Sequence, residues 1–300
     1  MPSQAFLNLL ETLKAQPDRA GQPIEDLRTM GMAKANAIPL PRDLDTTPVE
    51  AGGVPAEWVE VGKKARRKKN DSVLLYFHGG AYFRGSTHTV REMCGRLARA
   101  AEIPVLSVDY RVAPENPFPA AVEDALAAYR WLQTQGYAPG RIAVGGDSAG
   151  GGLACALLLG TRDYGALQPG AAVLLSPWVD LTQSGESMDS RAAEDPSLSR
   201  AYLDRFAGLY LNEQDAKDPL ASPLFGDLAG LAPMFIQAGT AEVLLDDAIR
   251  LAEKVRLAGG EAELDIWEGM THVWQNFGPD IPEGSEAVER AGAWLKARLG

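Results

Sequence analysis

Gly146-Asp147-Ser148-Ala149-Gly150 lies between a short apolar run, residues 142–144, and a longer apolar helical stretch, residues 148–159. A serine in the pattern G-x-S-x-G between a strand and a helix is typical of a nucleophile elbow, a tight turn that exposes the serine hydroxyl. The small residues at positions 146 and 150 let neighbouring backbone approach closely. The segment predicts that Ser148 is a nucleophile at the carboxyl end of a parallel strand, with Asp147 supporting the turn.

The chain on both sides of this turn alternates between short apolar runs and helical stretches. Runs of four to eight apolar residues between helical segments are typical of a mostly parallel sheet with helices on both faces. The sequence therefore predicts an α/β fold. We expect strands at residues 46–49, 58–61, 73–77, 105–108, 142–144, 173–175, 235–238 and 264–267, and helices at residues 89–101, 120–135, 148–159, 200–211, 246–258 and 285–299.

Two segments do not follow this alternation. Residues 1–45 are helical and then loop-like, with Phe6 and Leu10 among apolar residues at helical spacing. Residues 181–230 carry helix signals and no strand, as an insertion above the strand ends would. We expect both segments to form a helical cap over a core made of residues 46–180 and 231–300.

The nucleophile needs a base and an orienting carboxylate. Among three histidines, His78, His88 and His272, only His272 follows Ser148, and a triad around such an elbow runs in the order serine, acid, histidine. Glu242 follows the strand at residues 235–238, where a strand-end loop reaches His272. Asp246 is the alternative acid. Asp246 and Asp247 lie in the expected first turn of a helix, where carboxylates are common because they interact favourably with the helix dipole.

A third element follows the strand at residues 73–77, with the sequence His78-Gly79-Gly80-Ala81. A tetrahedral intermediate carries an oxyanion that needs preorganised N–H donors. We expect these donors to be the amides of Gly79 and Gly80, with that of Ala149 after the nucleophile. His78 is expected to brace this loop.

Together these segments resemble the hormone-sensitive-lipase-like esterases, the bacterial family IV carboxylesterases of the α/β-hydrolase superfamily. The resemblance extends over nearly the whole chain and is carried by residues 78–86, 109–132, 145–154, 174–182 and 269–277. Two positions depart from the family pattern: Ala81 replaces a fourth-position glycine, and Glu242 stands where aspartate is commoner. The resemblance also implies that Asp109, Arg111 and Glu115 shape the loop near the oxyanion hole.

The chemistry that this pattern indicates is two-step acyl transfer by a Ser–Glu–His triad, without metal or organic cofactor. The resemblance implies carboxylic esters of short to medium acyl chain as substrates. Three alternatives stay open: a lactone hydrolase, a non-catalytic ligand receptor of the same fold, and a triacylglycerol lipase. Residues expected to line the substrate pocket are aromatic or aliphatic: Phe83, Trp178, Tyr202, Phe206, Leu244 and Trp274.

The family resemblance implies a small-molecule ester or lactone as the partner, and composition argues against other classes of partner. A net charge of −11 argues against nucleic acid, and we interpret the basic run at residues 63–69 as a solvated loop. The longest apolar run, residues 153–159, is too short to span a membrane. We expect Cys94 and Cys155 to be buried core residues. With no signal peptide at the first residues, the sequence predicts a cytoplasmic protein. The family resemblance implies a possible homodimer.

Overall fold

A single mixed sheet forms the centre of the molecule in the computed structural model, which describes residues 2–16, 19–64, 66–67 and 71–300. Within these residues the sheet has eight strands in the order β1-β2-β4-β3-β5-β6-β7-β8. The first two strands pair antiparallel with each other, β2 pairs antiparallel with β4, and all later neighbours are parallel. The strands are β1 Leu44–Glu50, β2 Pro55–Val61, β3 Val73–Phe77, β4 Val105–Val108, β5 Ile142–Asp147, β6 Ala171–Leu175, β7 Met234–Gly239 and β8 Ala262–Trp267.

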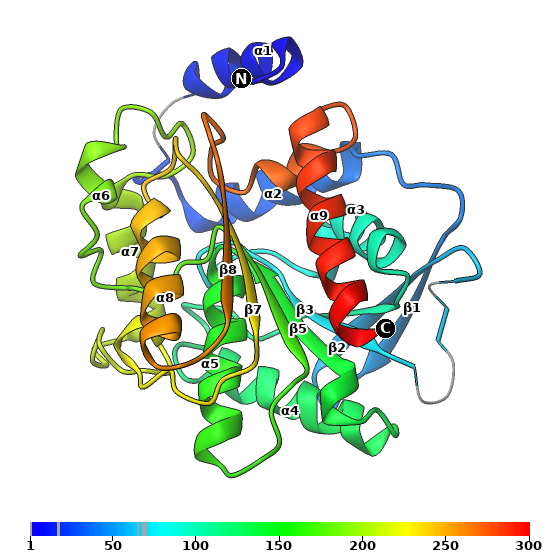
Figure 1. Cartoon of the computed structure of the whole chain (residues 1–300). Helices are drawn as coiled ribbons and strands as arrows, with labels where there is room; N and C mark the ends of the chain where they lie inside the picture. The colour runs from blue at the N-terminus through cyan, green and yellow to red at the C-terminus, as the bar shows by residue number, and fades with distance from the viewer. Residues whose placement is uncertain (1, 17–18, 65, 68–70) are drawn as a thin grey trace.

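Helices cover both faces of this sheet (Figure 1). On β3, Leu75 and Phe77 point into one hydrophobic cluster and Leu74 and Tyr76 into the other, as the two-residue period of a strand requires. The first cluster is closed by α4, α5 and α8, and the second by α3 and α9. The helices are α1 Gln4–Lys14, α2 Ile24–Ala37, α3 Thr87–Ala101, α4 Ala120–Thr134, α5 Ala149–Asp163, α6 Ser187–Ser190, α7 Arg200–Leu211, α8 Leu245–Leu257 and α9 Pro282–Leu299.

The expected α/β-hydrolase fold is confirmed, and each expected strand and helix is present with small shifts at its ends. The helix after the nucleophile begins at Ala149, because Ser148 itself has a backbone conformation that no helix contains. The short helix α6 was not expected from the sequence. No helix among the described residues combines the length and hydropathy that crossing a bilayer requires.

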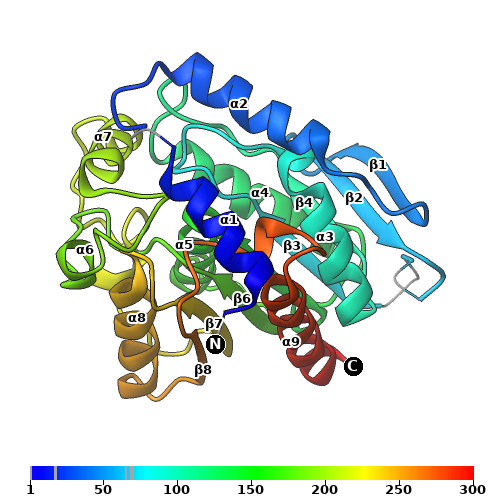
Figure 2. The ribbon, with the colours of Figure 1, turned by 90° about the horizontal axis from the view of Figure 1, so that it is seen from above.

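The helices from residues 1–45 and 181–230, which we call the cap, lie above the carboxyl ends of the parallel strands. Figure 2, viewed from that side, shows α1, α2, α6 and α7 arranged over and around the sheet edge. Phe6 of α1 is fully buried against Met270, Trp274 and Ile281, which flank the loop after β8. Through α1, the cap thus packs directly on the loop after β8, at the sheet edge where Ser148 lies.

Candidate active site

Ser148 lies in a sharp turn between β5 and α5. Its backbone has φ 54° and ψ −122°, a combination that L-residues rarely adopt. Strained backbone of this kind is concentrated at functional sites, where the surrounding structure maintains it. A Cβ atom on Gly150 would lie 2.0 Å from the Phe77 carbonyl oxygen, and one on Gly146 would lie 2.3 Å from the Gly150 carbonyl carbon. Glycine at both positions is therefore what allows the turn to pack against β3.

The structure brings Ser148, His272 and Glu242 into one hydrogen-bonded row. Nε2 of His272 lies 2.9 Å from Oγ of Ser148, and Nδ1 lies 2.6 Å from Oε2 of Glu242. The other carboxylate oxygen, Oε1, accepts hydrogen bonds from the Gly239 amide at 2.7 Å and from the Ser176 hydroxyl at 2.9 Å. A proton on Nδ1 satisfies the carboxylate and leaves Nε2 free to accept the serine proton.

The charges around His272 favour its protonated form. Burial by itself lowers the pKa of an imidazole, but the hydrogen bond and charge of Glu242 outweigh it. The charges of Asp195 and Asp147 act in the same direction, and the net result is a raised pKa for His272. An imidazolium formed during a reaction would thus be stabilised where it forms.

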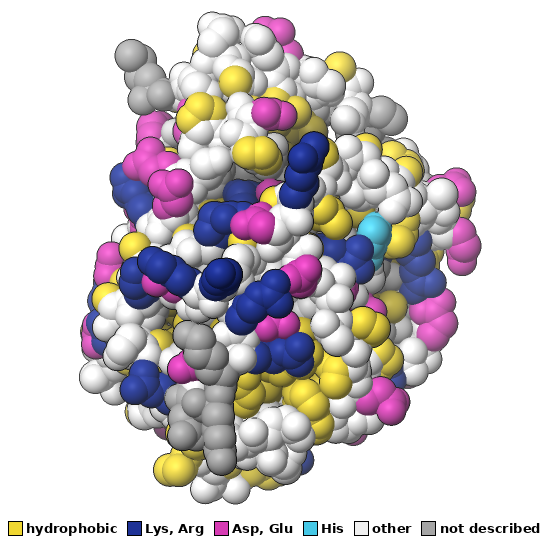
Figure 3. Space-filling model, turned by 90° about the vertical axis from the view of Figure 1, so that its right-hand side faces the viewer, with side chains coloured by type: hydrophobic (Ala, Val, Ile, Leu, Met, Phe, Trp, Pro, Cys, Tyr) yellow, Lys and Arg dark blue, Asp and Glu magenta, His cyan; other side chains and the backbone are white. Residues whose placement is uncertain are grey.

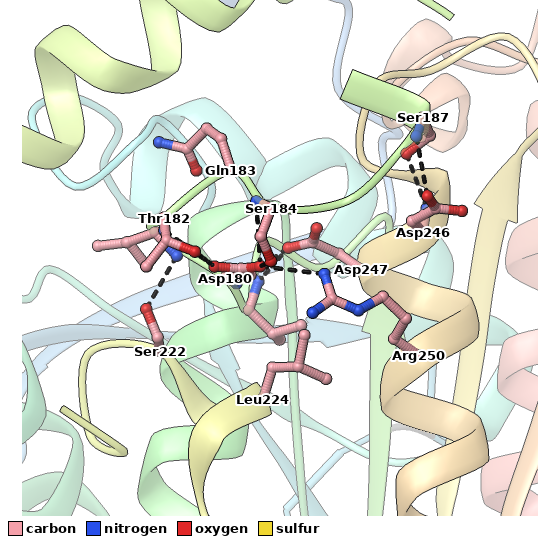
Figure 4. Close-up of polar contacts among 12 residues, drawn as sticks. Asp180, Thr182, Gln183, Ser184, Ser187, Ser222, Leu224, Asp246, Asp247 and Arg250 are labelled. Carbon is pink, nitrogen blue, oxygen red and sulfur yellow. Dashed lines mark hydrogen bonds and ion pairs between the residues drawn. The ribbon is translucent and has the colours of Figure 1, made fainter. Parts of the chain in front are cut away.

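The alternative acids lie elsewhere. Oδ2 of Asp246 accepts the Ser187 amide at 2.8 Å, and Oδ2 of Asp247 accepts the amides of Val179 and Asp180. Figure 4 shows both carboxylates turned toward the segment that follows β6. Burial raises the pKa of Asp247 well above its ordinary value. These two side chains fasten that segment and the cap to α8, and neither reaches His272.

The loop after β3 departs from the expectation in one respect. The Gly79 amide donates to Oδ1 of Asp147 at 3.0 Å, so it is not free to bind an oxyanion, and that prediction is wrong. Among the described residues, none accepts a hydrogen bond from the amides of Gly80, Ala81 or Ala149. Ala81 has a φ of 50° although it is not glycine, which marks a backbone held in place by its surroundings. Ala81 thus replaces Gly79 among the candidate donors.

His78 is fixed in the way that a bracing residue requires. Its ring stacks on Tyr110 with centroids 4.2 Å apart, and Nδ1 lies 3.0 Å from the Gly79 carbonyl oxygen. Burial lowers its pKa, which keeps the ring neutral. The Tyr110 hydroxyl donates to the His78 carbonyl oxygen at 2.7 Å, so Tyr110 contacts both the ring and the backbone of His78.

The charged residues near this loop have structural partners. Asp109 accepts the Thr87 amide at the start of α3, and Arg111 pairs with Asp124 and Glu123. Glu115 pairs with Arg28 of α2, and the Arg28 guanidinium also donates to the carbonyl oxygens of Phe83 and Ala113. Arg28 thus ties α2 of the cap to the loop after β3 and to the loop after β4.

The six residues expected to line the pocket are all buried; five of them belong to one hydrophobic cluster, and Trp274 belongs to another. Phe83 stacks on Phe206 at 3.6 Å, with Tyr202 against both, so these three join the loop after β3 to α7. Trp178 lies beside Tyr82. Leu244 belongs to the larger core cluster, whereas Trp274 packs under α1.

Sequence reasoning missed three residues near this site. Tyr82 stacks on Tyr210 at 3.9 Å between the loop after β3 and α7, and Ser176 binds Glu242. Tyr82 could have been selected from the sequence, because it is the aromatic residue that directly follows His78-Gly79-Gly80-Ala81. No local signal marks Ser176, because its partner lies 66 residues away.

The described residues of the basic run lie on another face of the molecule, and residues 65, 68 and 69 of the run fall outside the described residues. Lys64 pairs with Glu102, Arg66 with Asp45 and Arg67 with Glu60. Figure 3 shows blue and magenta side chains interspersed on this face.

A surface groove of about 530 Å³ between β1, β2 and α3 lies away from Ser148. Within the described residues, no group of three acidic, cysteine or histidine side chains could hold a metal ion.

Comparison with known proteins gives consistent matches. A family model for the alpha/beta hydrolase fold matches residues 74–276. An acetyl-hydrolase from Streptomyces hygroscopicus is 47% identical over 252 residues, covering 84% of this chain and 83% of that protein. An esterase from Acinetobacter venetianus is 36% identical over 242 residues, covering 80% and 78%.

Solved structures agree with these matches over the full length of the chain. An esterase of the bacterial hormone-sensitive lipase family has a TM-score of 0.94 at 44% identity, covering 100% of both chains. The esterase EstE5, from a crystal soaked with p-nitrophenyl butyrate, has a TM-score of 0.94 at 40% identity and covers 99% of both chains.

Proposed function

This chain belongs to the bacterial hormone-sensitive-lipase-like esterases of the α/β-hydrolase superfamily and hydrolyses carboxylic esters, and we propose that it does so with Ser148 as nucleophile, His272 as base and Glu242 as orienting acid. The observation that carries this proposal is the row of contacts at 2.9 and 2.6 Å from serine to histidine to glutamate. A hydroxyl at its ordinary pKa is a poor nucleophile, and an adjacent, oriented imidazole is the usual means of activating it.

In the first step, the Ser148 hydroxyl gives its proton to Nε2 of His272 while Oγ attacks the ester carbonyl carbon. The buried Glu242 carboxylate stabilises the imidazolium that forms and holds its proton on Nδ1. The carbonyl π bond opens and its oxygen becomes an oxyanion. Collapse of this intermediate breaks the bond to the alcohol oxygen, which takes the proton from Nε2 and leaves an acyl group on Ser148.

The oxyanion would be held by the amides of Gly80, Ala81 and Ala149, whose hydrogens have no acceptor among the described residues. Their preorganisation supports the assignment, since donors that are already in place cost no reorganisation when charge develops. Ala149 is the first residue of α5, so the partial positive charge of the helix N-terminus adds to this stabilisation.

In the second step, water takes the place of the alcohol. His272 accepts a proton from the water while the water oxygen attacks the acyl carbon. The second tetrahedral intermediate then expels Ser148 Oγ, which takes this proton back from His272. The products are a carboxylic acid, an alcohol and the free enzyme, so atoms and charge balance without a cofactor.

We propose substrates of short to medium acyl chain. The aromatic residues Phe83, Tyr202 and Phe206 close the space between the loop after β3 and the cap, which supports a limited pocket length. The name of one relative, acetyl-hydrolase, supports the same choice. None of these observations favours a lactone, a receptor or a triacylglycerol lipase.

We also propose a cytoplasmic location, supported by Cys94 and Cys155, which are both buried as free thiols. A homodimer stays a prediction, which the mass of the purified protein in solution tests.

The test of the proposed function is a substrate panel with wild type and Ser148→Ala. We expect p-nitrophenyl esters from acetate to hexanoate to be hydrolysed faster than laurate, and faster than an unsubstituted lactone. Ser148→Ala should lose about four orders of magnitude or more in kcat. Wild-type rates in Ser148→Ala would overturn the mechanism, and best turnover on laurate would overturn the substrate range.

A further inference from the structure

A second strained turn lies beside the nucleophile elbow, at the carboxyl end of β6. Its residue Ser176 has a φ of 46°, in the left-handed region that favours glycine, and its side chain is fully buried. This conformation is strained for a serine, and it persists only where the surrounding structure imposes it. Neither the strain nor the buried hydroxyl is used by the mechanism described above.

This turn is bonded to the backbone of the nucleophile. The Ser148 amide donates to the Leu175 carbonyl oxygen at 2.9 Å, and the Trp178 amide donates to the Ser148 carbonyl oxygen at 3.0 Å. The Ser176 amide donates to the Gln237 carbonyl oxygen of β7 at 2.7 Å. The backbone of the turn therefore has fixed positions relative to both the nucleophile strand and the acid strand.

The Ser176 side chain then connects the other two members of the row. Its hydroxyl donates to Oε1 of Glu242 at 2.9 Å, and its oxygen accepts the amide of Val273, the residue after His272, at 3.2 Å. One oxygen atom thus bridges the loop that carries the acid and the loop that carries the base.

The two bonds require a small side chain that both donates and accepts, which a hydroxyl does and an alanine methyl does not. The donation also fixes the carboxylate in rotation. With Oε1 held by the Ser176 hydroxyl and the Gly239 amide, Oε2 is the oxygen left to face Nδ1 of His272.

We propose that Ser176 is a positioning residue for ester hydrolysis, whose buried hydroxyl sets the orientation of the Glu242 carboxylate and its distance from His272. The inference rests on the proposed triad and extends it by a fourth side chain that touches no substrate. Ser176 acts through Glu242, so its contribution exists only while that carboxylate is present.

The test is a double-mutant cycle of Ser176→Ala with Glu242→Ala, measured as kcat and KM on p-nitrophenyl butyrate. A hydrogen bond to a charged group is worth about 1.5–3 kcal/mol, so Ser176→Ala should lower kcat about 10- to 100-fold. KM should stay within about threefold, since ground-state binding is untouched. In the Glu242→Ala background, the same change should cost less than about threefold.

Ser222 provides a matched control. It is also fully buried, and its hydroxyl accepts the Leu181 amide at 2.8 Å and donates to the Ala216 carbonyl oxygen at 2.6 Å. Ser222→Ala should lower the melting temperature about as much as Ser176→Ala while leaving kcat within about threefold of wild type. The far-downfield proton resonance of His272 Nδ1–H should shift or broaden in Ser176→Ala and stay unchanged in Ser222→Ala.

Each outcome separates this inference from the proposed function. If Ser176→Ala loses the same factor in both backgrounds, or no more than Ser222→Ala, Ser176 does not act through Glu242 and the inference fails while the triad stands. If Glu242→Ala itself keeps wild-type kcat, the proposed triad fails first.

Discussion

Replacing Glu242 with glutamine tests the orienting role of this residue with almost no change in shape. In the native site, Oε1 accepts from the Gly239 amide and the Ser176 hydroxyl. A glutamine must keep its carbonyl oxygen on that side, because its NH₂ group would face the fixed backbone N–H of Gly239. The NH₂ group is then directed at Nδ1 of His272, which has to become an acceptor.

The consequence is the wrong tautomer of the base. With Nδ1 accepting, the ring proton sits on Nε2, which lies 2.9 Å from Ser148 Oγ and can no longer take the serine proton. A comparable acid-to-amide change in a serine protease triad lowers kcat about 10⁴-fold. At about 1.4 kcal/mol per factor of ten, this corresponds to about 5.5 kcal/mol of lost transition-state stabilisation. We expect Glu242→Gln to lose between about 10³- and 10⁴-fold in kcat, with little change in KM.

The assay is initial-rate hydrolysis of p-nitrophenyl butyrate, with folding checked by circular dichroism. The matched control is Asp246→Asn, whose side chain contacts the Ser187 amide and not His272, and which should keep kcat within about fivefold of wild type. A fall of less than tenfold for Glu242→Gln, or a larger loss for Asp246→Asn, would refute the reasoning from tautomers.

Two further predictions concern pH and the cap. Glu242, Asp195 and Asp147 hold the pKa of His272 above its ordinary value despite burial. Because the base must be neutral, kcat/KM should decrease as the pH is lowered, and the midpoint of this decrease should lie above the ordinary histidine pKa of about 6.5. Asp195→Asn removes one of these charges and should move this limb to lower pH; an unchanged or higher midpoint would contradict it. Phe6→Ala removes a fully buried ring from α1, worth about 3–5 kcal/mol, and should release α1 locally, seen as faster proteolytic cleavage within residues 2–16. Wild-type cleavage rates in this variant would show that α1 is held by other contacts.

Much of the fold follows from the sequence alone. The order of short apolar runs and helical stretches is a local property, since the periods of strands and helices are visible within about ten residues. The elbow at Ser148 is local in the same way, because its glycines and its position between strand and helix lie within one short segment. With one histidine after Ser148, the choice of His272 required no geometry beyond the order of the chain.

The hydrogen-bond partners of the site could be determined only in three dimensions. Gly79 and Gly80 look alike in the sequence, and what separates them is the Asp147 carboxylate, 68 residues further along the chain, which takes the Gly79 amide. Glu242 and Asp246 are likewise close neighbours, and only the path of the loop after β7 turns one toward His272 and the other toward Ser187. Hydrophobic patterns indicate which side chains are buried. A hydrogen bond, by contrast, requires two atoms within about 3 Å of each other and in the right direction. These positions are fixed only when strands that are distant in the sequence have come together in the sheet.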